Sequence, residues 1–215
     1  MLKIYGSDLS SPANKVRFAA NALEIKFEYI KLNLRDGDQR KPEFLKLNPA
    51  GKIPAIDDDG FILFESNAII KYLARKQKSS LYSSDLKERA IVEQWIDFTS
   101  MHVGMALSKV MFNRVFYKFL NVAIDERSLK EGLEFLTKFL PVVNDQLAQN
   151  SYLAGKTLTL ADINLLATLD PAEAAQVDLS LYKNIVKWRN ELKKKDFYTK
   201  VHKEYGEMLK QPASR

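Results

Sequence analysis

The sequence predicts a mixed α/β domain over residues 1–78, followed by an all-α domain over residues 86–215. In the first segment short apolar runs alternate with helical patterns, whereas strand signals stop once the second segment begins. Between them, residues 79–85 are polar, serine-rich and without periodicity, as expected of a linker. A chain of 215 residues is long enough to form one large core or two smaller ones.

Four strands and two helices are predicted in the first domain. The strand candidates are bounded by Gly, Pro and Asp clusters and cover Leu2–Tyr5, Phe27–Leu32, Ile53–Ile56 and Phe61–Phe64. Apolar residues recur at helical spacing over Pro12–Leu23 and Ser66–Arg75. Residues 57–60 read DDDG and predict a hairpin turn between the last two strands. With a further helix allowed between the second and third strands, the order is β-α-β-(α)-β-β-α, which predicts a single mixed sheet with helices on its faces.

Only helices are predicted in the second domain. One helical pattern runs from Leu86 to about Leu120, and a second stripe, from Leu129 to Leu147, is expected to be interrupted or kinked near Pro141. The run TLAD at residues 159–162 resembles a capping box at the start of a helix that ends before residue 171. Two further helices are expected, at residues 185–192 and 197–205.

The composition disfavours several kinds of site. The chain has no cysteine, so any sulfur chemistry must arrive with a ligand. Its only histidines are His102 and His202, which disfavours zinc enzymes and serine–histidine hydrolases, and no metal is expected. The N-terminus lacks the apolar run of a signal peptide, and no stretch approaches the ~20 apolar residues that span a bilayer. We therefore expect a cytoplasmic protein without membrane association.

The net charge of +6 is concentrated near the C-terminus. Residues 183–215 hold ten Lys and Arg against four Asp and Glu, while residues 1–182 hold 23 of each kind. Such a segment is more often a solvated face than a binding surface, so nucleic acid is not an expected partner.

Three segments of the first domain together predict a site for an anionic, peptide-like ligand. The first is the turn at Ser10, Ser11 and Pro12. Ser11 is the expected N-cap of the following helix, with Pro12 as its first residue. Ser10 is then free to project near the unpaired N–H groups and the positive dipole end of that helix. The serine cap by itself requires no function.

The second segment is Asn48–Ile56, and the third is Glu65 with Ser66. A cis Ile53–Pro54 bond would turn the main chain of Ile53 outward, where it could pair with a peptide, although a plain loop proline is the alternative. Ser66 follows a strand and starts a helix, so it is an expected N-cap in any fold. Its hydroxyl and the nearby N–H groups suit a carboxylate, and Glu65 suits an ammonium group.

In combination these segments resemble the cytosolic glutathione transferases, over essentially the whole chain. The matching runs are LSSPANKVR, LNPAGKIPAI, FESNAIIKYL and LTLADI, with NIVKWRNEL followed by DFYTKV near the end. The resemblance implies a thioredoxin-like first domain that binds glutathione and a helical second domain that supplies most of a hydrophobic pocket. It also implies glutathione as co-substrate, a small hydrophobic electrophile as second substrate, and a homodimer.

The resemblance further implies roles for individual residues. Ser10 stands two positions before the proline, where serine-type members (theta, delta and phi-like) have the catalytic hydroxyl, and Ser11 is its competitor. Such a hydroxyl would donate to the sulfur of glutathione and favour the thiolate. A thiol pKa shift of ~2 units requires about 2.7 kcal/mol, which one hydrogen bond to an anion and a helix dipole can supply. For glutathione itself the implied contacts are Ile53 at the cysteinyl part, Glu65 and Ser66 at the γ-glutamyl end, and Lys52, Gln39 and Arg40 at the glycine carboxylate.

Two positions depart from parts of the family. Ala50 stands where some branches place an aromatic residue that locks into the partner subunit, and Gly51 stands where delta-like members have a basic side chain. The second departure favours phi-like and bacterial members. The candidates for the hydrophobic pocket are Leu9, Met105, Phe112 and Phe116, although residues at helical spacing more often belong to a core.

Alternatives to a serine-type transferase remain. A non-catalytic glutathione-binding protein or interaction module would keep the same fold, but the presence of Ser10 together with Glu65 and Ser66 counts against it. A thiol–disulfide enzyme usually needs a protein cysteine. Conjugation, peroxide reduction and dehalogenation are all compatible with the sequence, and it does not identify the electrophile.

Overall fold

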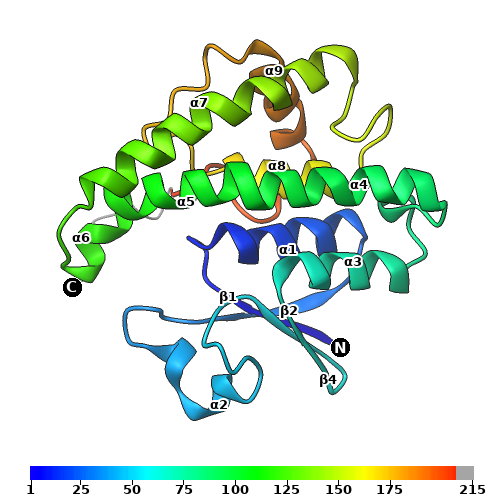
Figure 1. Ribbon diagram of the computed structural model, residues 1–215. Coiled ribbons are helices and arrows are strands. Elements are labelled where there is room, and N and C mark those ends of the chain that lie inside the picture. The colour runs from blue at the N-terminus through cyan, green and yellow to red at the C-terminus, as the bar shows by residue number, and fades with distance from the viewer. Residues whose placement is uncertain (207–215) are drawn as a thin grey trace. The chain divides into compact units, whose positions relative to one another are not determined.

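The computed structural model describes residues 1–206 and divides into two compact units (Figure 1). The first unit contains residues 1–79 and also the described part of the chain after residue 194. The second unit is Ser80–Lys194. This division differs from the expected one at its C-terminal end, because residues 195–206 group with the α/β unit and not with the helices.

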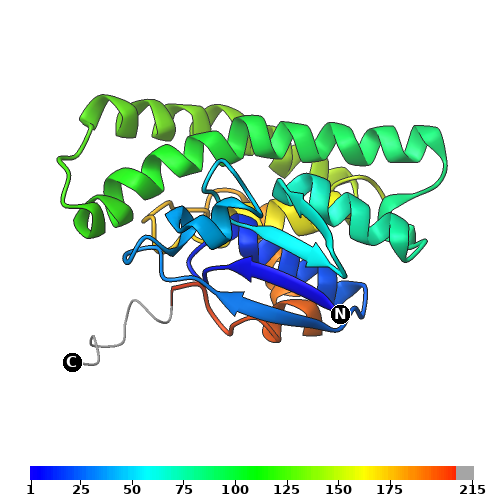
Figure 2. The ribbon, with the colours of Figure 1, turned by 90° about the horizontal axis from the view of Figure 1, so that it is seen from below.

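A four-stranded mixed sheet forms the centre of the first unit. Its strands are β1 (Leu2–Gly6), β2 (Phe27–Lys31), β3 (Ala55–Asp58) and β4 (Phe61–Phe64), in the order β2-β1-β3-β4. β1 is parallel to β2 and antiparallel to β3, which is antiparallel to β4. Figure 2 shows β1 and β2 side by side. Burial alternates along β1, as the two-residue period of a strand requires.

Two helices of the first unit, α1 (Ser11–Ala22) and α3 (Ser66–Lys76), pack together on one face of the sheet (Figure 1). Their buried sides include Val16, Ala20, Ile70 and Leu73. The connection from β2 to β3 contains the short helices η1 (Asp38–Arg40) and α2 (Pro42–Leu45). The bounds of α1 and α3 lie close to the predicted ones.

The strand β3 begins later than predicted. Ile53 and Pro54 precede it, and the ladder starts at Ala55, because a proline has no N–H to offer to a neighbouring strand. Of the two alternatives for Pro54, the structure has the cis Ile53–Pro54 bond. The predicted hairpin is confirmed: two residues, Asp59 and Gly60, connect β3 to β4 with φ angles of 52° and 94°, as in a type I′ turn.

The C-terminal segment of the first unit packs on α1. The ring of Phe18 lies 5.1 Å from that of Tyr198 and 6.4 Å from that of Phe197, both on the four-residue helix α10 (Asp196–Thr199). The predicted helix through residue 205 is therefore too long, since residues 200–206 have no helical assignment. The packing of aromatic rings across the chain, and not helical periodicity, places these side chains.

The second unit is helical. Five segments follow one another without a break, as predicted for residues 86–120: α4 (Leu86–Phe98), η3 (Thr99–Gly104), α5 (Met105–Met111), η4 (Phe112–Phe116) and α6 (Tyr117–Leu120). The segments η3 and η4 have π-helical hydrogen bonding. Helix α7 (Glu126–Gln149) packs along α5 and continues through Pro141, so the expected interruption is absent, whereas the alternative of a kink stays a prediction. Pro141 is exposed, so water can reach the carbonyl group that the proline leaves unpaired.

The remaining helices of this unit are α8 (Leu160–Leu169), which is almost wholly buried, and α9 (Lys183–Lys193). The predicted capping box of Thr159 and Asp162 is confirmed, as is the end of α8 before residue 171. The expected linker contains a short helix, η2 (Ser80–Tyr82), with two buried side chains. Over residues 1–206 the structure has no helix with the length and apolar character that crossing a membrane requires.

Candidate functional site

The register of the sheet brings the three predicted segments to one end of the first unit. Ala55 is the first residue of β3, and it pairs with Tyr5 near the end of β1 and with Phe64 at the end of β4. The turn that carries Ser10 follows β1, the Ile53–Pro54 bond immediately precedes Ala55, and Glu65 immediately follows Phe64. The antiparallel pairings therefore place all three segments at the same end of the sheet, next to the paired residues Tyr5, Ala55 and Phe64.

Ser10, and not Ser11, is the N-cap of α1. Its backbone is extended, with φ −97° and ψ 104°, and its Oγ accepts a hydrogen bond of 3.3 Å from the N–H of Ala13. The expected cap at Ser11 is wrong because Pro12 is tolerated at either of the first two helical positions, whose N–H groups have no intrahelical acceptor. Since the oxygen of Ser10 acts as the acceptor, its hydroxyl proton is left for another partner.

Several contacts hold the turn before Ser10. The N–H of Ser10 donates to the carbonyl oxygen of Ser7 at 2.9 Å, and the side-chain amide of Asn14 donates to that of Asp8 at 2.8 Å. From the C-terminal segment, the hydroxyl of Tyr205 donates to the carbonyl oxygen of Leu9 at 2.7 Å. The position of the cap is therefore fixed by helix α1 and by the returning end of the chain.

Asn48 shapes the loop that carries Lys52 and Ile53. This asparagine is only 2% exposed; its Oδ1 accepts from the N–H of Ala50 at 3.0 Å, and its Nδ2 donates to the carbonyl oxygen of Lys52 at 2.6 Å. Lys52 is exposed and Ile53 is half-buried. This role of Asn48 was not predicted from the sequence, although asparagine before proline is a known signal for turn initiation.

Gln39 lies against this loop. A Cβ atom on Gly51, which has φ +61°, would come within 3.1 Å of the carbonyl oxygen of Gln39, so the two backbones approach closely. The side-chain amide nitrogen of Gln39 donates to the carbonyl oxygen of Leu34 at 3.4 Å, whereas its Oε1 is buried without a partner. Arg40 is exposed. The structure thus brings Gln39 to the segment that carries Lys52.

Helix α3 begins at Ser66 with Glu65 as its cap residue, so the expected N-cap role of Ser66 is wrong. Glu65 has φ 72° and ψ 108°, a conformation that is uncommon for a residue with a side chain. Glu65 is exposed, and its side chain makes no hydrogen bond that caps the helix. Ser66 occupies the first helical position, beside N–H groups that have no acceptor within the helix.

Lys15 on α1 reaches this helix start, and sequence reasoning did not identify it. Its Nζ donates to Ser66 Oγ at 3.2 Å and to Asn67 Oδ1 at 2.7 Å. Burial lowers the pKa of Lys15 to about 7, and the negative charge of Glu65 acts in the opposite direction. A signal was present in the sequence, because Lys15 lies four residues before Ala19 and thus on the apolar stripe of α1.

The candidates for a hydrophobic pocket are divided between the units. Leu9 belongs to the first unit, and Met105, Phe112 and Phe116 belong to the second. In the second unit Met105 is 56% exposed and Phe112 is 39% exposed, so neither is a core residue. Phe112 and Phe116 lie seven and eleven positions after Met105 in a continuous helical run, and residues at this spacing share one side of a helix. Their role in a pocket stays a prediction.

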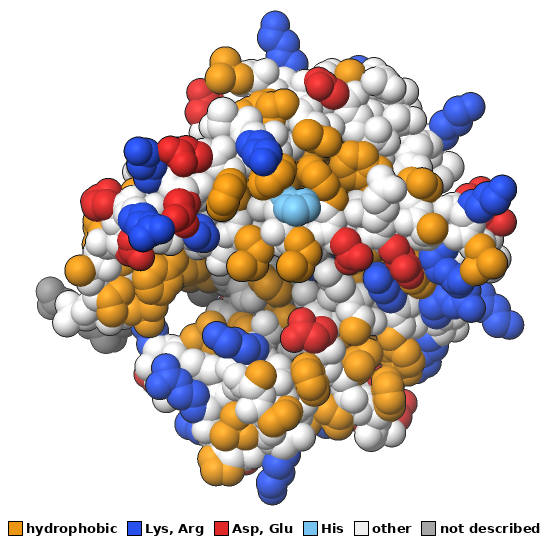
Figure 3. Space-filling view, viewed as in Figure 1, with side chains coloured by type: hydrophobic (Ala, Val, Ile, Leu, Met, Phe, Trp, Pro, Cys, Tyr) orange, Lys and Arg blue, Asp and Glu red, His pale blue; other side chains and the backbone are white. Residues whose placement is uncertain are grey.

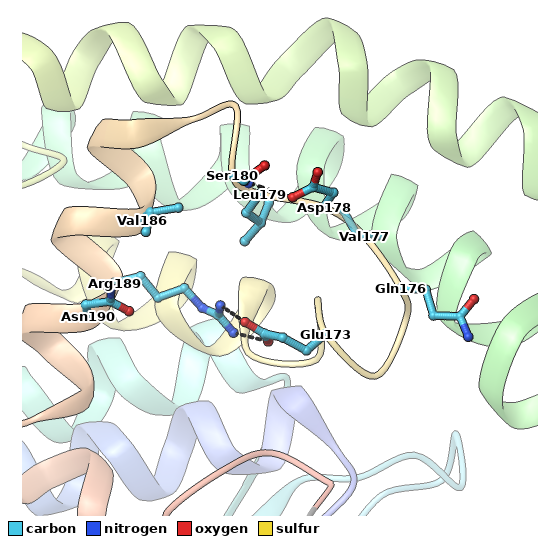
Figure 4. A pocket seen from close by; sticks show the side chains of 9 residues that line it. All are labelled: Glu173, Gln176, Val177, Asp178, Leu179, Ser180, Val186, Arg189 and Asn190. Carbon is cyan, nitrogen blue, oxygen red and sulfur yellow. Dashed lines mark hydrogen bonds and ion pairs between the residues drawn. The ribbon is translucent and has the colours of Figure 1, made fainter.

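A surface pocket of about 550 Å³ lies in the second unit, between the segment after α8 and helix α9 (Figure 4). Arg189 and Glu173 form an ion pair there, with 2.7 Å between Nη2 and Oε2, and the same nitrogen donates to the carbonyl oxygen of Asp170 at 3.0 Å. A second pocket, of about 540 Å³, is lined by residues of the first unit that include Phe27 and Lys200. Neither lining contains a residue predicted for the site.

The two histidines pack among aromatic rings. His102 lies 4.7 Å, between ring centroids, from Phe139 in the second unit, and His202 lies 5.7 Å from Phe18 in the first. Among the residues with described structure, no three His, Asp or Glu side chains gather in a way that would hold a metal ion. Of the basic C-terminal segment, Lys210 and Arg215 lie outside the described residues.

Comparison with known proteins identifies two family domains. The glutathione S-transferase N-terminal domain matches residues 1–75 and the glutathione S-transferase C-terminal domain matches residues 101–196. Glutathione S-transferase F13 of Arabidopsis thaliana is 34% identical over 167 residues, which cover 76% of each chain.

Solved structures of glutathione transferases resemble this chain over most of its length. Glutathione transferase F2 from Populus trichocarpa superposes with a TM-score of 0.87 and 28% identity, covering 94% of this chain and 97% of that one. Glutathione S-transferase I from maize, in complex with an atrazine glutathione conjugate, has a TM-score of 0.85 and 32% identity, covering 93% and 95%. The predicted fold class, a thioredoxin-like α/β domain followed by an all-α domain, is confirmed. The chain therefore belongs to the glutathione S-transferase family of enzymes.

Proposed function

We propose that this protein uses the hydroxyl of Ser10 to activate the thiol of glutathione for attack on a small hydrophobic electrophile. The observation that carries the proposal is the geometry of Ser10: its oxygen caps α1 by accepting from Ala13, which leaves its proton to be donated to a ligand sulfur. A serine in this role is a hydrogen-bond donor and not a nucleophile.

The reaction begins with loss of the thiol proton of glutathione to solvent. A free thiol with a pKa of about 8.5 is mostly protonated at neutral pH, and a hydrogen bond to the anion favours the thiolate. Such a bond contributes about 1.5–3 kcal/mol and the N-terminal end of α1 adds up to about 1 kcal/mol. The thiolate sulfur then forms a bond to the electrophilic atom of the second substrate. In a substitution that atom releases its leaving group with the bonding electron pair; in an addition the π electron pair moves to the neighbouring atom, which takes up a proton from solvent.

The tripeptide would lie along the end of the sheet where the three segments meet. Ile53 precedes β3, so its main chain is outside the ladder and suits pairing with the cysteinyl part. Glu65 and Ser66 suit the ammonium and carboxylate of the γ-glutamyl end. Lys52, with Gln39 and Arg40 in the neighbouring segment, suits the glycine carboxylate.

The second substrate would meet Leu9, Met105, Phe112 and Phe116. The partial exposure of Met105 and Phe112 supports this role, because a core residue would not be accessible to a ligand. The maize relative in complex with an atrazine glutathione conjugate supports conjugation as the reaction. No metal is part of the proposal.

A homodimer is part of the proposed function. The second unit exposes a cluster of large apolar side chains, with Met101 at 66% and Phe135 at 42% exposure, around the ring pair of His102 and Phe139. Figure 3 shows a histidine surrounded by hydrophobic side chains on this face. Contiguous apolar surface of this kind marks interaction sites. A cytosolic location is also proposed, because thiols such as that of glutathione stay reduced there.

The test is binding and turnover of glutathione with a panel of hydrophobic electrophiles. We expect Ser10→Ala to raise the pKa of the bound thiol, read from thiolate absorbance, by about 1–2 units and to lower kcat at neutral pH by roughly tenfold, because the variant loses the hydrogen bond and keeps the helix dipole. Ser11→Ala should behave as the wild type. Ser10→Gly serves as the matched control for helix stability, because glycine is a tolerated cap that costs only a few tenths of a kcal/mol.

Three outcomes would overturn parts of the proposal. Loss of activity in the Ser11 variant alone would move the role by one residue. Unchanged activity in both serine variants would remove the hydroxyl mechanism. Tight binding of glutathione by a wild-type protein that turns over none of the electrophiles would indicate a non-catalytic binding protein.

A further inference from the structure

A buried lysine connects the two helices that begin at the proposed site. Lys15 is on the second turn of α1, 51 residues from Ser66 in sequence, and it is only 7% exposed. Its ammonium nitrogen donates to Ser66 Oγ at 3.2 Å and to Asn67 Oδ1 at 2.7 Å. The start of α3 is thereby attached to the helix that Ser10 caps.

The direction of the first of these bonds determines what Ser66 can do. A serine hydroxyl has one proton to donate, and an ammonium group can only donate. Because Ser66 Oγ accepts from Lys15, its own proton is free to be directed elsewhere. Ser66 is therefore prepared as a donor, which is the function that a carboxylate at this helix start requires.

The charge of Lys15 is incompletely balanced within the protein. Both of its hydrogen-bond partners are neutral groups, a hydroxyl and an amide oxygen. Among the described residues, the charge that acts on Lys15 from an element packed against α1 is that of Glu65, whose own side chain is exposed to solvent. Burying a cation without a close anion is costly, so an anionic ligand beside Ser66 would supply a missing interaction.

We propose that Lys15 is a positioning residue for the γ-glutamyl carboxylate: it orients Ser66 as a donor and places a positive charge beneath the start of α3. The inference rests on the proposed glutathione site and adds a group that does not itself touch the ligand. It applies to the binding of any ligand with that γ-glutamyl end, whether or not the ligand has a thiol.

The linkage between charge and binding gives the inference a distinctive signature. Burial lowers the pKa of Lys15 to about 7, so part of the unliganded protein carries a neutral amine at neutral pH. A bound carboxylate favours the ammonium form, so binding must take up protons, and by reciprocity affinity must fall as the pH rises. A lysine that merely filled space would show neither effect.

The experiment uses S-methylglutathione, which has no ionisable thiol, so protons exchanged on binding do not come from the sulfur. Calorimetric titrations at about pH 7 in buffers of different ionisation enthalpy measure proton uptake, and titrations from about pH 6 to about pH 8 measure the pH dependence of Kd. The full-length variants are Lys15→Met, Lys15→Arg and, as a matched control from the same unit, the exposed Lys26→Met.

We expect Lys15→Met to weaken binding at about pH 6 by roughly tenfold or more and to abolish proton uptake and the pH dependence of Kd. Lys15→Arg should retain most of the affinity with a flatter pH profile, since a guanidinium does not titrate in this range. Lys26→Met should match the wild type. In the Ser66→Ala background, Lys15→Met should cost less than it does alone, because the two residues act together.

Two results would overturn the inference while leaving the proposed site intact: wild-type affinity in Lys15→Met, or proton uptake that is the same in both proteins. If Lys15→Met does not fold, the pH dependence of Kd in the wild type is the test. An affinity of the wild type that is constant with pH would contradict the positioning role of Lys15. A wild-type protein that fails to bind S-methylglutathione at all would instead refute the proposed glutathione site.

Discussion

The hydroxyl of Tyr205 donates a hydrogen bond of 2.7 Å to the carbonyl oxygen of Leu9, the residue directly before Ser10. The two residues are 196 positions apart in sequence, and Tyr205 is buried. The backbone that carries the proposed catalytic hydroxyl is therefore held from one side by α1 and from the other by the C-terminal segment. Small displacements at a reacting group reduce rates strongly, so this contact matters for activity as well as for stability.

Replacing Tyr205 with phenylalanine removes the hydroxyl and leaves the ring in place. We expect the free energy of unfolding to fall by about 1 kcal/mol and kcat/KM to fall by roughly three- to tenfold. Denaturant unfolding and steady-state kinetics measure the two effects. Tyr117→Phe, in the second unit, is the control. Kinetics equal to the wild type in Tyr205→Phe would show that the turn keeps its position without this bond.

The buried Lys15 predicts a pH dependence of stability. In the unfolded chain its pKa is near 10.5, whereas in the folded protein burial lowers it to about 7. Between these two values the unfolded state binds more protons, so the free energy of unfolding contributed by this residue increases as the pH rises, by at most about 1.4 kcal/mol per pH unit. Below about pH 7 both states are protonated, and the destabilisation by the buried charge is complete.

Urea unfolding of the wild type and of Lys15→Met at about pH 7 and about pH 9 tests this prediction. The difference in unfolding free energy between the two proteins should shift in favour of the wild type at the higher pH. Lys26→Met controls for the titration of an exposed lysine. A difference that does not change with pH would mean that Lys15 stays charged in the folded protein.

Among single substitutions in the second unit, we expect replacement of Asp162 to lower the free energy of unfolding most. It is fully buried, and it accepts hydrogen bonds from the N–H of Leu153 at 2.8 Å, from the N–H of Thr159 at 3.0 Å and from Nε1 of Trp188 at 3.0 Å. Burial raises its pKa, while these donors act in the opposite direction.

Asp162→Ala leaves these three N–H donors, and the hydroxyl of Thr159 that also donates to Asp162 at 3.0 Å, without their acceptor. We therefore expect a loss of on the order of 3 kcal/mol in unfolding free energy. Asp178→Ala, at an exposed position, should cost far less. Urea denaturation measures both variants. A loss below about 1 kcal/mol for Asp162→Ala would show that water or local rearrangement satisfies these donors.

The exposed apolar cluster of the second unit predicts the position of the dimer contact. Met101→Glu places a charge in this cluster at a side chain that is 66% exposed, so folding should be unaffected. We expect the variant to dissociate at concentrations at which the wild type is a dimer, with a dissociation constant at least about tenfold higher. Analytical ultracentrifugation measures this.

Leu181→Glu, at a position that is 81% exposed, is the matched control for adding a charge to the same unit. It should leave the dimer unchanged. Equal association of Met101→Glu and the wild type would place the contact elsewhere.

Local sequence patterns were sufficient to predict most helices and strands of this fold. They were not sufficient where packing between distant segments determines the end of an element. The strands followed from short apolar runs bounded by Gly, Pro and Asp, and the capping box at Thr159 followed from the spacing of a few residues. The cap of α1 was misplaced because Pro12 is compatible with either serine as the cap. The extent of the last helix was overestimated because Phe197 and Tyr205 are apolar for their contacts with α1 and its preceding turn, not for helical periodicity.

The candidate site shows the same division. Its three segments were recognisable from turn and helix-start chemistry, and the sheet register then placed them together. The contribution of Lys15 was not recognisable from the sequence. A lysine on an apolar stripe is interpreted as a solvated residue unless its partner on another helix is known. The roles of Asn48 and Tyr205 likewise depend on hydrogen bonds that no single-sequence pattern contains.

The packing of α10 on Phe18 means that the first unit is assembled from both ends of the chain, with the helical unit inserted between its parts. On the ribosome, residues 1–79 emerge early but must wait for more than a hundred further residues before the rings that cover Phe18 are made. Until then this part of α1 is an uncovered apolar surface, available to chaperones or to aggregation.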